Sequence, residues 1–231
     1  MDNIKNLLTP RLLKIASMVD KGSSVIDVGC DHGYIPIYLA QQGIAVKALA
    51  ADINDGPLKA ADKNIKKFGL EEKVKTCKSD GLLQIVCSDF DTIIIAGMGG
   101  SLIADIMSAG VRGKTYILQP MTALDNLIEF LSENGFEILS HVLVEEENHI
   151  YNILKVCDGS FCPSELQMHL GELIDKDELY FKYAEKLRNK FIKIISGLEK
   201  SQNCDNVRLE KYKNLLEELR GRIKNEQQRI Y

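Results

Sequence analysis

The feature of the sequence that most constrains its fold is a regular alternation of short β-branched runs with helix-like segments, from Ser24 to about Val156. This alternation is typical of parallel strands that are joined by helical crossovers within one sheet. The expected strands are residues 25–28, 46–51, 74–78, 92–95 and 115–118, with helices between them. We therefore predict an α/β fold built on five parallel strands.

Two more extended runs, residues 137–145 and 150–156, follow a predicted helix near residues 124–134 and are separated by a short polar turn, residues 146–149. Such a short connection predicts an antiparallel pair, because a parallel return needs a crossover of about a dozen residues. Before the first strand, an apolar stripe at helical spacing predicts a helix that covers one face of the sheet. The stripe consists of Leu12, Leu13, Ile15, Ala16, Met18 and Val19.

The C-terminal part of the chain has a different pattern. Residues 158–174 are rich in Gly, Ser and Pro and mark a boundary. Beyond it, two heptad seams predict an antiparallel, coiled-coil helical hairpin. The seams are Tyr180, Ala184, Leu187, Phe191, Ile194 and Leu198, then Leu209, Tyr212, Leu216, Leu219 and Ile223. We expect a domain in residues 1–157, a linker in 158–177 and the hairpin in 178–231; a purely structural role for the hairpin stays open.

Composition excludes several classes of protein. The chain is 45% hydrophobic and 27% charged, as expected for a globular protein, and it contains no apolar run of the roughly 20 residues that a membrane span needs. The N-terminus lacks the pattern of a signal peptide, so we expect a cytoplasmic protein. The six cysteines form no CxxC pair and no zinc-like spacing with histidine, so we expect reduced thiols and no metal. The net charge of -4 argues mildly against a polyanionic partner unless basic patches meet it.

The strongest motif is VIDVGCDHGY, residues 25–34, in which an apolar strand runs into a glycine-rich turn and then a helix pattern. A dinucleotide fingerprint needs glycine at positions 29, 31 and 34, where this chain has Gly29, Asp31 and Tyr34. The turn instead resembles the acidic-x-Gly-x-x-x-Gly turn of class I methyltransferases that use S-adenosylmethionine. The acids suit the ammonium and sulfonium of that cofactor. The expected cofactor-binding residues here are Asp27, Gly29, Asp31 and Gly33; a turn that simply needs glycine is the alternative.

Two further acids follow the second and third strands. Asp52 lies at the end of the second strand, where a carboxylate accepts both ribose hydroxyls, and we group Ile53 and Asn54 with it. Ser79, Asp80 and Gly81 follow the third strand, where the methyltransferase fold places a group that binds the adenine amine. Asp80 also fits as the cap of a helix beginning at Leu82, and both roles are compatible.

The fourth strand ends in IIIAGMGGSL, residues 93–102, where amino-directed methyltransferases carry a polar-Pro-Pro-aromatic loop. Three glycines in four residues predict close approach of the backbone to a ligand. Gly97 is expected at the cofactor, and Met98 and Gly99 at the reacting atoms. Met98 and Gly100 are also expected to contact the substrate.

Seven segments, taken in order, resemble the bacterial family that methylates N1 of adenine 22 in transfer RNA. They are LLTPRL, VGCDHGYIPIYL, ADINDGPLKAADKN, SDG, IIIAGMGG, ILQPM and EEENHIYNI, and the likeness covers nearly the whole chain. The resemblance implies a Rossmann-like class I methyltransferase sheet, S-adenosylmethionine as cofactor and tRNA as partner. This chain departs from the family pattern with Met121, where Asn is expected, and with Gly33, where alanine is expected.

The resemblance also implies roles for individual residues. Asp31 is expected near the transfer point, where it accepts a hydrogen of the adenine amine, or else contacts only the cofactor. The walls of the base pocket are expected to be Met98, Gly99, Gln119, Pro120 and Tyr151, although Tyr151 also fits as a strand packing residue. RNA contacts are expected from Lys5, Arg11 and Lys14 near the N-terminus and from hairpin residues Lys186, Arg188, Lys190, Lys193, Lys211, Lys213, Arg220, Arg222 and Lys224.

Two other readings remain open at the level of sequence. One is a class I methyltransferase that acts on a small molecule or protein and uses the hairpin as a dimerisation arm. The other is a catalytically silent module that binds cofactor or RNA, against which the acids Asp27, Asp52 and Asp80 argue. We expect a monomer, with a dimer as the alternative.

Overall fold

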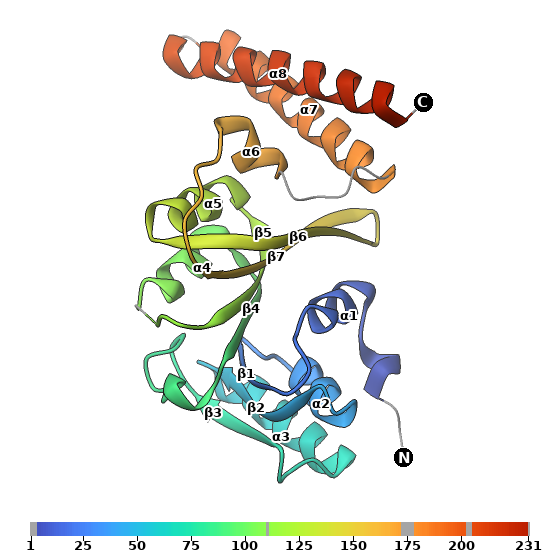
Figure 1. Ribbon diagram of the computed structural model, residues 1–231, viewed down its shortest axis with the longest axis vertical. Coiled ribbons are helices and arrows are strands. Elements are labelled where there is room, and N and C mark those ends of the chain that lie inside the picture. The colour runs from blue at the N-terminus through green and yellow to red at the C-terminus, as the bar shows by residue number, and fades with distance from the viewer. Residues whose placement is uncertain (1–3, 110, 172–177, 202–204, 231) are drawn as a thin grey trace. The chain divides into compact units, whose positions relative to one another are not determined.

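The computed structural model describes residues 4–109, 111–171, 178–201 and 205–230. The chain forms two compact units, which divide between Phe161 and Cys162 (Figure 1). The elements of the first unit are η1 Ile4–Leu7, α1 Pro10–Ser17, β1 Ser23–Val28, α2 Tyr34–Gln41, β2 Ala45–Asp52, α3 Asp55–Phe68, β3 Val74–Lys78, η2 Cys87–Asp89, β4 Thr92–Gly99, α4 Gly100–Met107, β5 Thr115–Thr122, α5 Leu124–Glu133, β6 Phe136–Glu146 and β7 His149–Asp158. Those of the second unit are α6 Glu165–Leu170, α7 Glu178–Glu199 and α8 Asn206–Ile230.

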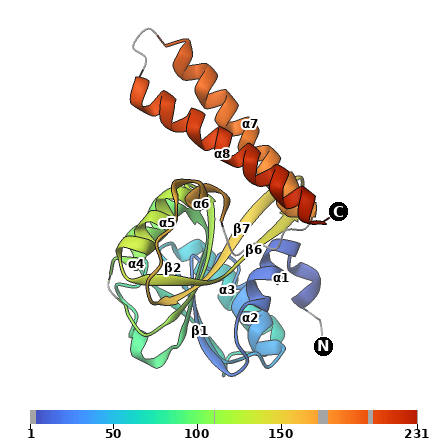
Figure 2. The same ribbon diagram turned by 45° about the horizontal axis from the view of Figure 1, so that its top comes forward.

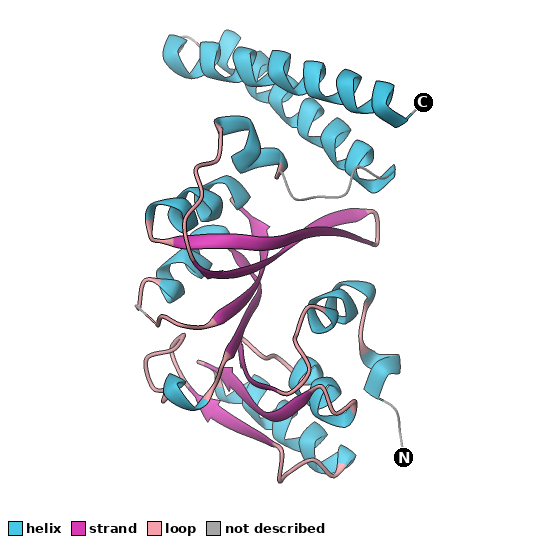
Figure 3. Cartoon of the chain, viewed as in Figure 1, coloured by secondary structure: helices cyan, strands magenta, loops and turns pink. Residues whose placement is uncertain are grey.

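The first unit is built on a seven-stranded sheet with the order β3-β2-β1-β4-β5-β7-β6 (Figure 3). Strands β1 to β5 pair in parallel. Strand β7 is antiparallel to both β5 and β6. The predicted fold class, a Rossmann-like sheet of five parallel strands plus an antiparallel pair, is confirmed. Because the five strands are parallel, their carboxyl ends meet at one edge of the sheet.

Both faces of the sheet are covered by helices, as the near-continuous apolar strands require. Side chains alternate along β4: Ile94 packs into the cluster that contains Ile15 and Ala16 of α1. Ile93 and Ile95 pack into the cluster on the opposite face, with α4 and α5. The predicted N-terminal helix is therefore confirmed as a cover of one face.

The β6–β7 hairpin closes in two residues, Glu147 and Asn148, which have φ values of 49° and 65°. Positive φ at both central residues is typical of the type I′ turn, whose twist matches that of the flanking strands. The pairing of Glu146 with His149 follows directly from this turn.

Two predictions about the connections are wrong. No α-helix begins at Leu82: turns and the short 3-10 helix η2 connect β3 to β4. The Ser79 hydroxyl donates to Gly81 O at 2.9 Å and accepts from Gln84 N at 3.3 Å, which stabilises a turn instead of a helix. In addition, β4 continues through the predicted glycine loop to Gly99, because it stays paired with an equally extended β5 across a register shift between Ala96 and Met98.

In the second unit, α7 and α8 lie side by side as a hairpin (Figure 2). The predicted seams are largely buried, including Tyr180 and Phe191 of α7 and Leu219 of α8. At the seam position that follows Phe191, Ile195 is buried in place of Ile194, which is only half-buried. The segment predicted as a linker contains α6, which begins at a capping box formed by Ser164 and Gln167. The three-part division of the chain stays a prediction.

Candidate active site

The turn after β1 has the conformation that its glycines suggest. Gly29, Asp31 and Gly33 have φ values of 73°, 48° and 71°. A β-carbon on Gly29 would lie 2.3 Å from Met98 Cε, and one on Gly33 would lie 3.0 Å from Ala61 Cβ. Both glycines are thus required by positive φ and by close neighbours. Asp31 adopts the same left-handed region without being glycine, a strain that is common at functional sites.

Asp27 is the most unusual ionisable group at this edge. The residue is only 4% exposed. Burial, and then the negative charge of Asp52, raises the pKa of Asp27 to about 7. A buried acid of this kind favours a cationic ligand, which would compensate for its charge. Burial, and then the negative charges of Asp27 and Asp52, also raise the pKa of the neighbouring Cys30 thiol, which therefore stays protonated.

Asp52 ends β2 and is half-buried. Its Oδ1 accepts a hydrogen bond from Asn54 N at 2.8 Å, while the side chain of Asn54 does not cap α3. Ile53 beside it is 53% exposed. The end of β2 thus presents a carboxylate and an apolar surface next to the glycine turn.

The end of β3 runs into a turn that is held by its own hydrogen bonds. Ser79 is 2% exposed, and its hydroxyl is engaged within the turn by Gly81 and Gln84. Asp80 is exposed, and its backbone N–H donates to Gln84 Oε1 at 2.7 Å. The sequence allowed Asp80 to cap a helix. It does not do so, because no helix begins there.

At the end of β4, the glycines serve two purposes. Gly97 has a φ of 77° and lies at the register shift against β5, where the regular pairing of the two strands is interrupted. Gly100 starts α4 and is buried: a β-carbon there would lie 2.1 Å from Ala123 O. Packing alone therefore explains why residue 100 is glycine. Its predicted contact with substrate stays a prediction. Met98 and Gly99 lie between these two glycines, and Met98 reaches back to Gly29.

Gln119 and Pro120 lie inside β5 and are buried. Gln119 Oε1 accepts from Arg11 Nη1 at 2.6 Å and from Gly97 N at 3.2 Å, and its Nε2 donates to Pro120 O at 3.0 Å. The amide of Gln119 thus holds the ends of β4 and β5 and a side chain of α1 together. Met121 beyond it is 47% exposed.

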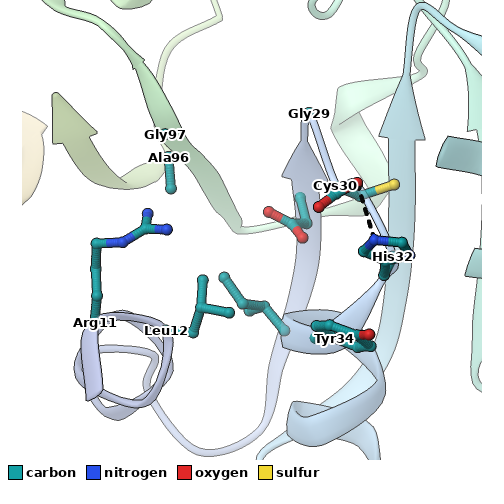
Figure 4. Close-up of a pocket in the computed structure, with 11 residues that line it drawn as sticks. Arg11, Leu12, Gly29, Cys30, His32, Tyr34, Ala96 and Gly97 are labelled. Carbon is teal, nitrogen blue, oxygen red and sulfur yellow. Dashed lines mark ion pairs between the residues drawn. The ribbon is translucent and has the colours of Figure 1, made fainter. Parts of the chain in front are cut away.

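A cavity of about 280 Å³ lies beside the turn after β1 (Figure 4). Arg11 and Leu12 of α1 form one wall, the turn that carries Gly29 forms the opposite wall, and Ala96 and Gly97 close the space from β4. His32 at the rim lies 3.6 Å from the Asp31 carboxylate and stacks on Tyr34. The complete lining is Arg11, Leu12, Asp27, Gly29, Cys30, Asp31, His32, Tyr34, Ile35, Ala96 and Gly97.

The cavity includes four of the predicted site residues, Asp27, Gly29, Asp31 and Gly97. The predicted residues outside its lining are Gly33, Asp52, Ile53, Asn54, Ser79, Asp80, Gly81, Met98, Gly99, Gly100, Gln119, Pro120, Tyr151, Lys14 and Arg188. Arg188 belongs to the second unit, where it pairs with Glu185 at 2.7 Å. Sequence reasoning missed the cavity wall formed by α1 and assigned Arg11 to RNA contact. The available signals were a basic residue at the start of an apolar helix and the position of that residue within the segment LLTPRL.

The described residues show neither a metal-binding cluster nor a membrane-spanning helix. Within the ranges that the structure describes, no group of three or more His, Cys, Asp or Glu side chains is placed to hold a metal ion. Among the helices in those ranges, none is long and apolar enough to cross a membrane.

Comparisons with known proteins agree with this geometry. A family model described as a methyltransferase domain matches residues 8–154. The tRNA (adenine(22)-N(1))-methyltransferase of Bacillus subtilis (strain 168) is 36% identical over 151 residues, which cover 64% of this chain and 63% of that protein. The aligned part thus spans less than two thirds of that relative.

Two solved structures match most of the chain. Streptococcus pneumoniae Sp1610, described as a putative tRNA (m1A22) methyltransferase and crystallised with S-adenosyl-L-methionine, superimposes with a TM-score of 0.79, at 32% identity over 90% of this chain and 99% of that one. M. capricolum TrmK, crystallised with S-adenosyl-homocysteine, gives a TM-score of 0.81 at 28% identity over 94% and 98% of the two chains. This chain therefore belongs to the methyltransferase family, and the members that it matches include the tRNA (adenine(22)-N(1))-methyltransferases.

Proposed function

We propose that this protein transfers a methyl group from S-adenosylmethionine to N1 of adenine 22 in tRNA. The observation that carries the proposal is the cavity at the carboxyl edge of the sheet, in which the buried Asp27 lies beside the glycine turn and opposite the end of β4. The relatives that match this chain carry the name of the same reaction or were crystallised with the same cofactor or its product.

The residues at this edge fit S-adenosylmethionine. The cofactor carries an ammonium and a sulfonium, and the buried carboxylate of Asp27 needs a positive charge nearby. Asp52 offers its carboxylate to the ribose hydroxyls, and the exposed Ile53 offers an apolar surface to the adenine ring. Ser79, Asp80 and Gly81 lie at the next strand end, where Asp80 is exposed and available to the adenine amine.

The end of β4 forms the acceptor side of the proposed site. Positive φ at Gly97 brings the backbone of Gly97, Met98 and Gly99 to the strand edge, and Met98 contacts the turn at Gly29. When bound, the cofactor supplies a methyl group on a positively charged sulfur. The lone pair of N1 forms the new bond to the methyl carbon while the carbon–sulfur bond breaks and its electron pair stays on sulfur. The protein aligns the two reactants and excludes water from them.

Asp31 is the residue that we propose to act on the acceptor base. Its side chain is 76% exposed and lies at the cavity rim, 3.6 Å from His32 Nε2. Methylation at N1 leaves the base positively charged until a proton leaves the amino group. A carboxylate that accepts a hydrogen bond from this amino group stabilises the developing charge. Asp31 therefore has a role in the chemical step that is separate from cofactor binding.

The target base has to leave its stack in the folded RNA, at a cost of roughly a few kcal/mol. The proposed walls of the receiving pocket are Met98, Gly99, Gln119, Pro120 and Tyr151. The Arg11 guanidinium lies over the Tyr151 ring, 5.3 Å from its centroid, and the His149 ring stacks with Tyr151 at a centroid distance of 6.1 Å. Gln119 is bonded within the protein and shapes the pocket through Arg11 and Gly97.

Lysines and arginines on α1 and on the α7–α8 hairpin are the proposed RNA contacts, with Lys14 and Arg188 as representatives. Many hairpin cations are already paired with acids, such as Lys213 with Glu199 and Arg220 with Glu217. Such a surface favours contacts with the RNA backbone that weaken with salt and depend on RNA shape.

Incubation of the protein with S-adenosylmethionine and bulk unmodified tRNA, followed by mass-spectrometric mapping, tests the proposal. We expect one methyl group on N1 of adenine 22, and no product with Asp52→Asn at low cofactor concentration. A methyl group at another position, or none although the cofactor binds, would contradict the proposed substrate.

A further inference from the structure

Two successive bulges interrupt the pairing of β4 with β5 near their carboxyl ends. The register pairs residues 96, 98 and 99 of β4 with residues 119, 120 and 122 of β5. Gly97 is therefore an additional residue of β4, and Met121 is an additional residue of β5. Bulges are rare between parallel strands and are frequent next to active sites, where they redirect a side chain. The second bulge compensates for the first, so the pairing continues to Thr122.

The two bulge residues differ in their surroundings. Gly97 lines the cavity, and its backbone N–H donates to Gln119 Oε1 at 3.2 Å. Met121 lies outside the cavity lining and is 47% exposed, although Gln119 and Pro120 just before it are buried. Its Sδ accepts a hydrogen bond from Gln119 Nε2 at 3.5 Å. The sulfur is thus held at a buried amide, while the residue keeps a large apolar surface exposed at the end of β5.

Tyr151, the stacking face that the sequence suggested, already has two neighbours at its ring. The Arg11 guanidinium lies 5.3 Å from the ring centroid, and the His149 ring stacks with it at a centroid distance of 6.1 Å. A base that stacked on Tyr151 would compete with both groups. Met121 instead presents an apolar surface that is exposed before any base arrives.

We propose that Met121 is the apolar contact of the target base, which packs against the Met121 side chain and not onto the Tyr151 ring. This inference rests on the proposed function. The neighbours of Met121 on β5, residues 120 and 122, pair with Met98 and Gly99, which form the proposed acceptor side of the site. Met121 therefore adds a wall to the proposed base pocket at the place where the second bulge redirects its side chain.

The chemistry of methionine suits a base that changes during the reaction. Its side chain is unbranched and polarisable, and its three rotatable bonds let it adapt to different shapes. The proposed reaction adds a methyl group and a positive charge to the base. A flexible apolar side chain accommodates the methyl group, and because it is neutral it does not repel the charge.

A double-mutant cycle between protein and RNA tests this assignment. The affinity of the full chain, saturated with S-adenosylhomocysteine, is measured for one unmodified tRNA and for the same tRNA with an abasic nucleotide at position 22. The proteins are wild type, Met121→Ala, Met121→Leu, which keeps an apolar side chain of similar volume, and Met121→Gln, which keeps the length but is polar. Thermal unfolding verifies that each variant folds.

Leu139→Ala is the matched control. Leu139 is also an additional residue at a bulge, because residues 138 and 140 of β6 pair with the consecutive residues 156 and 155 of β7. It is 50% exposed, close to the value for Met121. Residues 155 and 156 pair in turn with Ile117 and Tyr116 in the amino half of β5, so Leu139 lies away from the carboxyl edge of the sheet.

We expect wild type, Met121→Leu and Leu139→Ala to bind the unmodified tRNA roughly 10-fold more tightly than the abasic tRNA. In Met121→Ala and Met121→Gln this preference should fall to about threefold or less, while the affinity for S-adenosylhomocysteine stays within about threefold of wild type.

An unchanged preference for the unmodified tRNA in Met121→Ala would overturn the assignment. Equal weakening of both RNAs would also overturn it, because the residue would then hold the RNA and not the base. Wild-type measurements alone keep the test valid if Met121→Ala fails to fold, since equal affinity of wild type for the two RNAs would exclude a base contact. If wild type binds no tRNA, or methylates none at adenine 22, the proposed function itself is refuted.

Discussion

The terminal methyl of Met98 lies 2.3 Å from the position that a β-carbon on Gly29 would occupy. The Met98 side chain, at the end of β4, therefore lies directly against the backbone of Gly29, which follows β1 at the carboxyl edge of the sheet. This contact joins the proposed cofactor turn to the proposed acceptor side and fixes the space between them.

Replacement of Gly29 by alanine tests that contact. The new β-carbon strains a backbone with a φ of 73° and displaces Met98. We expect a loss of about 1–3 kcal/mol in the free energy of unfolding and weaker S-adenosylhomocysteine binding. Gly43→Ala is the matched control, because Gly43 has a φ of 65° but nothing lies within 4 Å of the position that its β-carbon would take. Equal losses in the free energy of unfolding of Gly29→Ala and Gly43→Ala would show that the displacement of Met98 does not contribute to the loss.

Stability is expected to depend on pH through Asp27. Burial and the charge of Asp52 raise its pKa from 3.8 to about 7. Between these two pH values the carboxyl is protonated in the folded protein and ionised in the unfolded chain. The contribution of Asp27 to stability therefore falls as pH rises from about 4 to about 7, by on the order of 4 kcal/mol in the absence of ligand. Thermal unfolding between pH 4 and 8 measures this loss.

Asp27→Asn supplies the control for the pH effect. It should flatten the pH dependence and stabilise the ligand-free protein above pH 7, while it weakens S-adenosylhomocysteine binding. In wild type, affinity for this ligand should rise up to about pH 7, because the ammonium favours the ionised carboxyl. A variant with the same pH dependence as wild type would exclude Asp27 as the titrating group.

Asp31→Asn separates a chemical role from a cofactor contact. Asparagine keeps the size of the side chain and tolerates the φ of 48°, but it carries no charge. We expect kcat to fall roughly 10- to 100-fold with less than about a threefold change in cofactor affinity. Single-turnover methylation and calorimetry measure the two quantities, with the exposed Asp105→Asn on α4 as control. A loss of cofactor affinity at unchanged kcat would assign Asp31 to the cofactor alone.

The hairpin cations without an acidic partner offer a test of RNA contact. Among the described residues, Lys190, Lys193 and Lys224 are exposed and form no ion pair. Their joint replacement by Glu should weaken tRNA binding and reduce the dependence of log Kd on log salt by about 2–3. The control replaces Lys21, Lys63 and Lys73, which are exposed residues of the first unit. Equal affinity in wild type and the hairpin variant, with an altered mass in solution, would favour a dimerisation arm.

Most of the sheet was predictable because strand periodicity and connection length are local properties. The parallel strands, the antiparallel pair and the covering N-terminal helix all follow from the spacing of apolar residues, and they are confirmed. The extension of β4 to Gly99 was not predictable. It depends on pairing with β5 across the register shift, and local sequence favours a loop there.

The cavity could be predicted only in part, for a similar reason. Asp27 and Gly29 lie on a strand and turn that the motif itself defines, and both line the cavity. Arg11 joins Gln119 across 108 positions of sequence, and no pattern within either segment indicates that contact. The predicted helix at Leu82 is wrong, because side-chain hydrogen bonds of Ser79 and Gln84 stabilise a turn there.

Binding of S-adenosylhomocysteine to the purified protein tests the central claim most directly. Calorimetric titration should show one ligand per chain, with roughly 10- to 100-fold weaker binding in Asp52→Asn and no change in Glu133→Gln, an exposed acid of α5. The absence of binding to wild type, or equal affinity in wild type and Asp52→Asn, would contradict the placement of this cofactor at the carboxyl edge of the sheet.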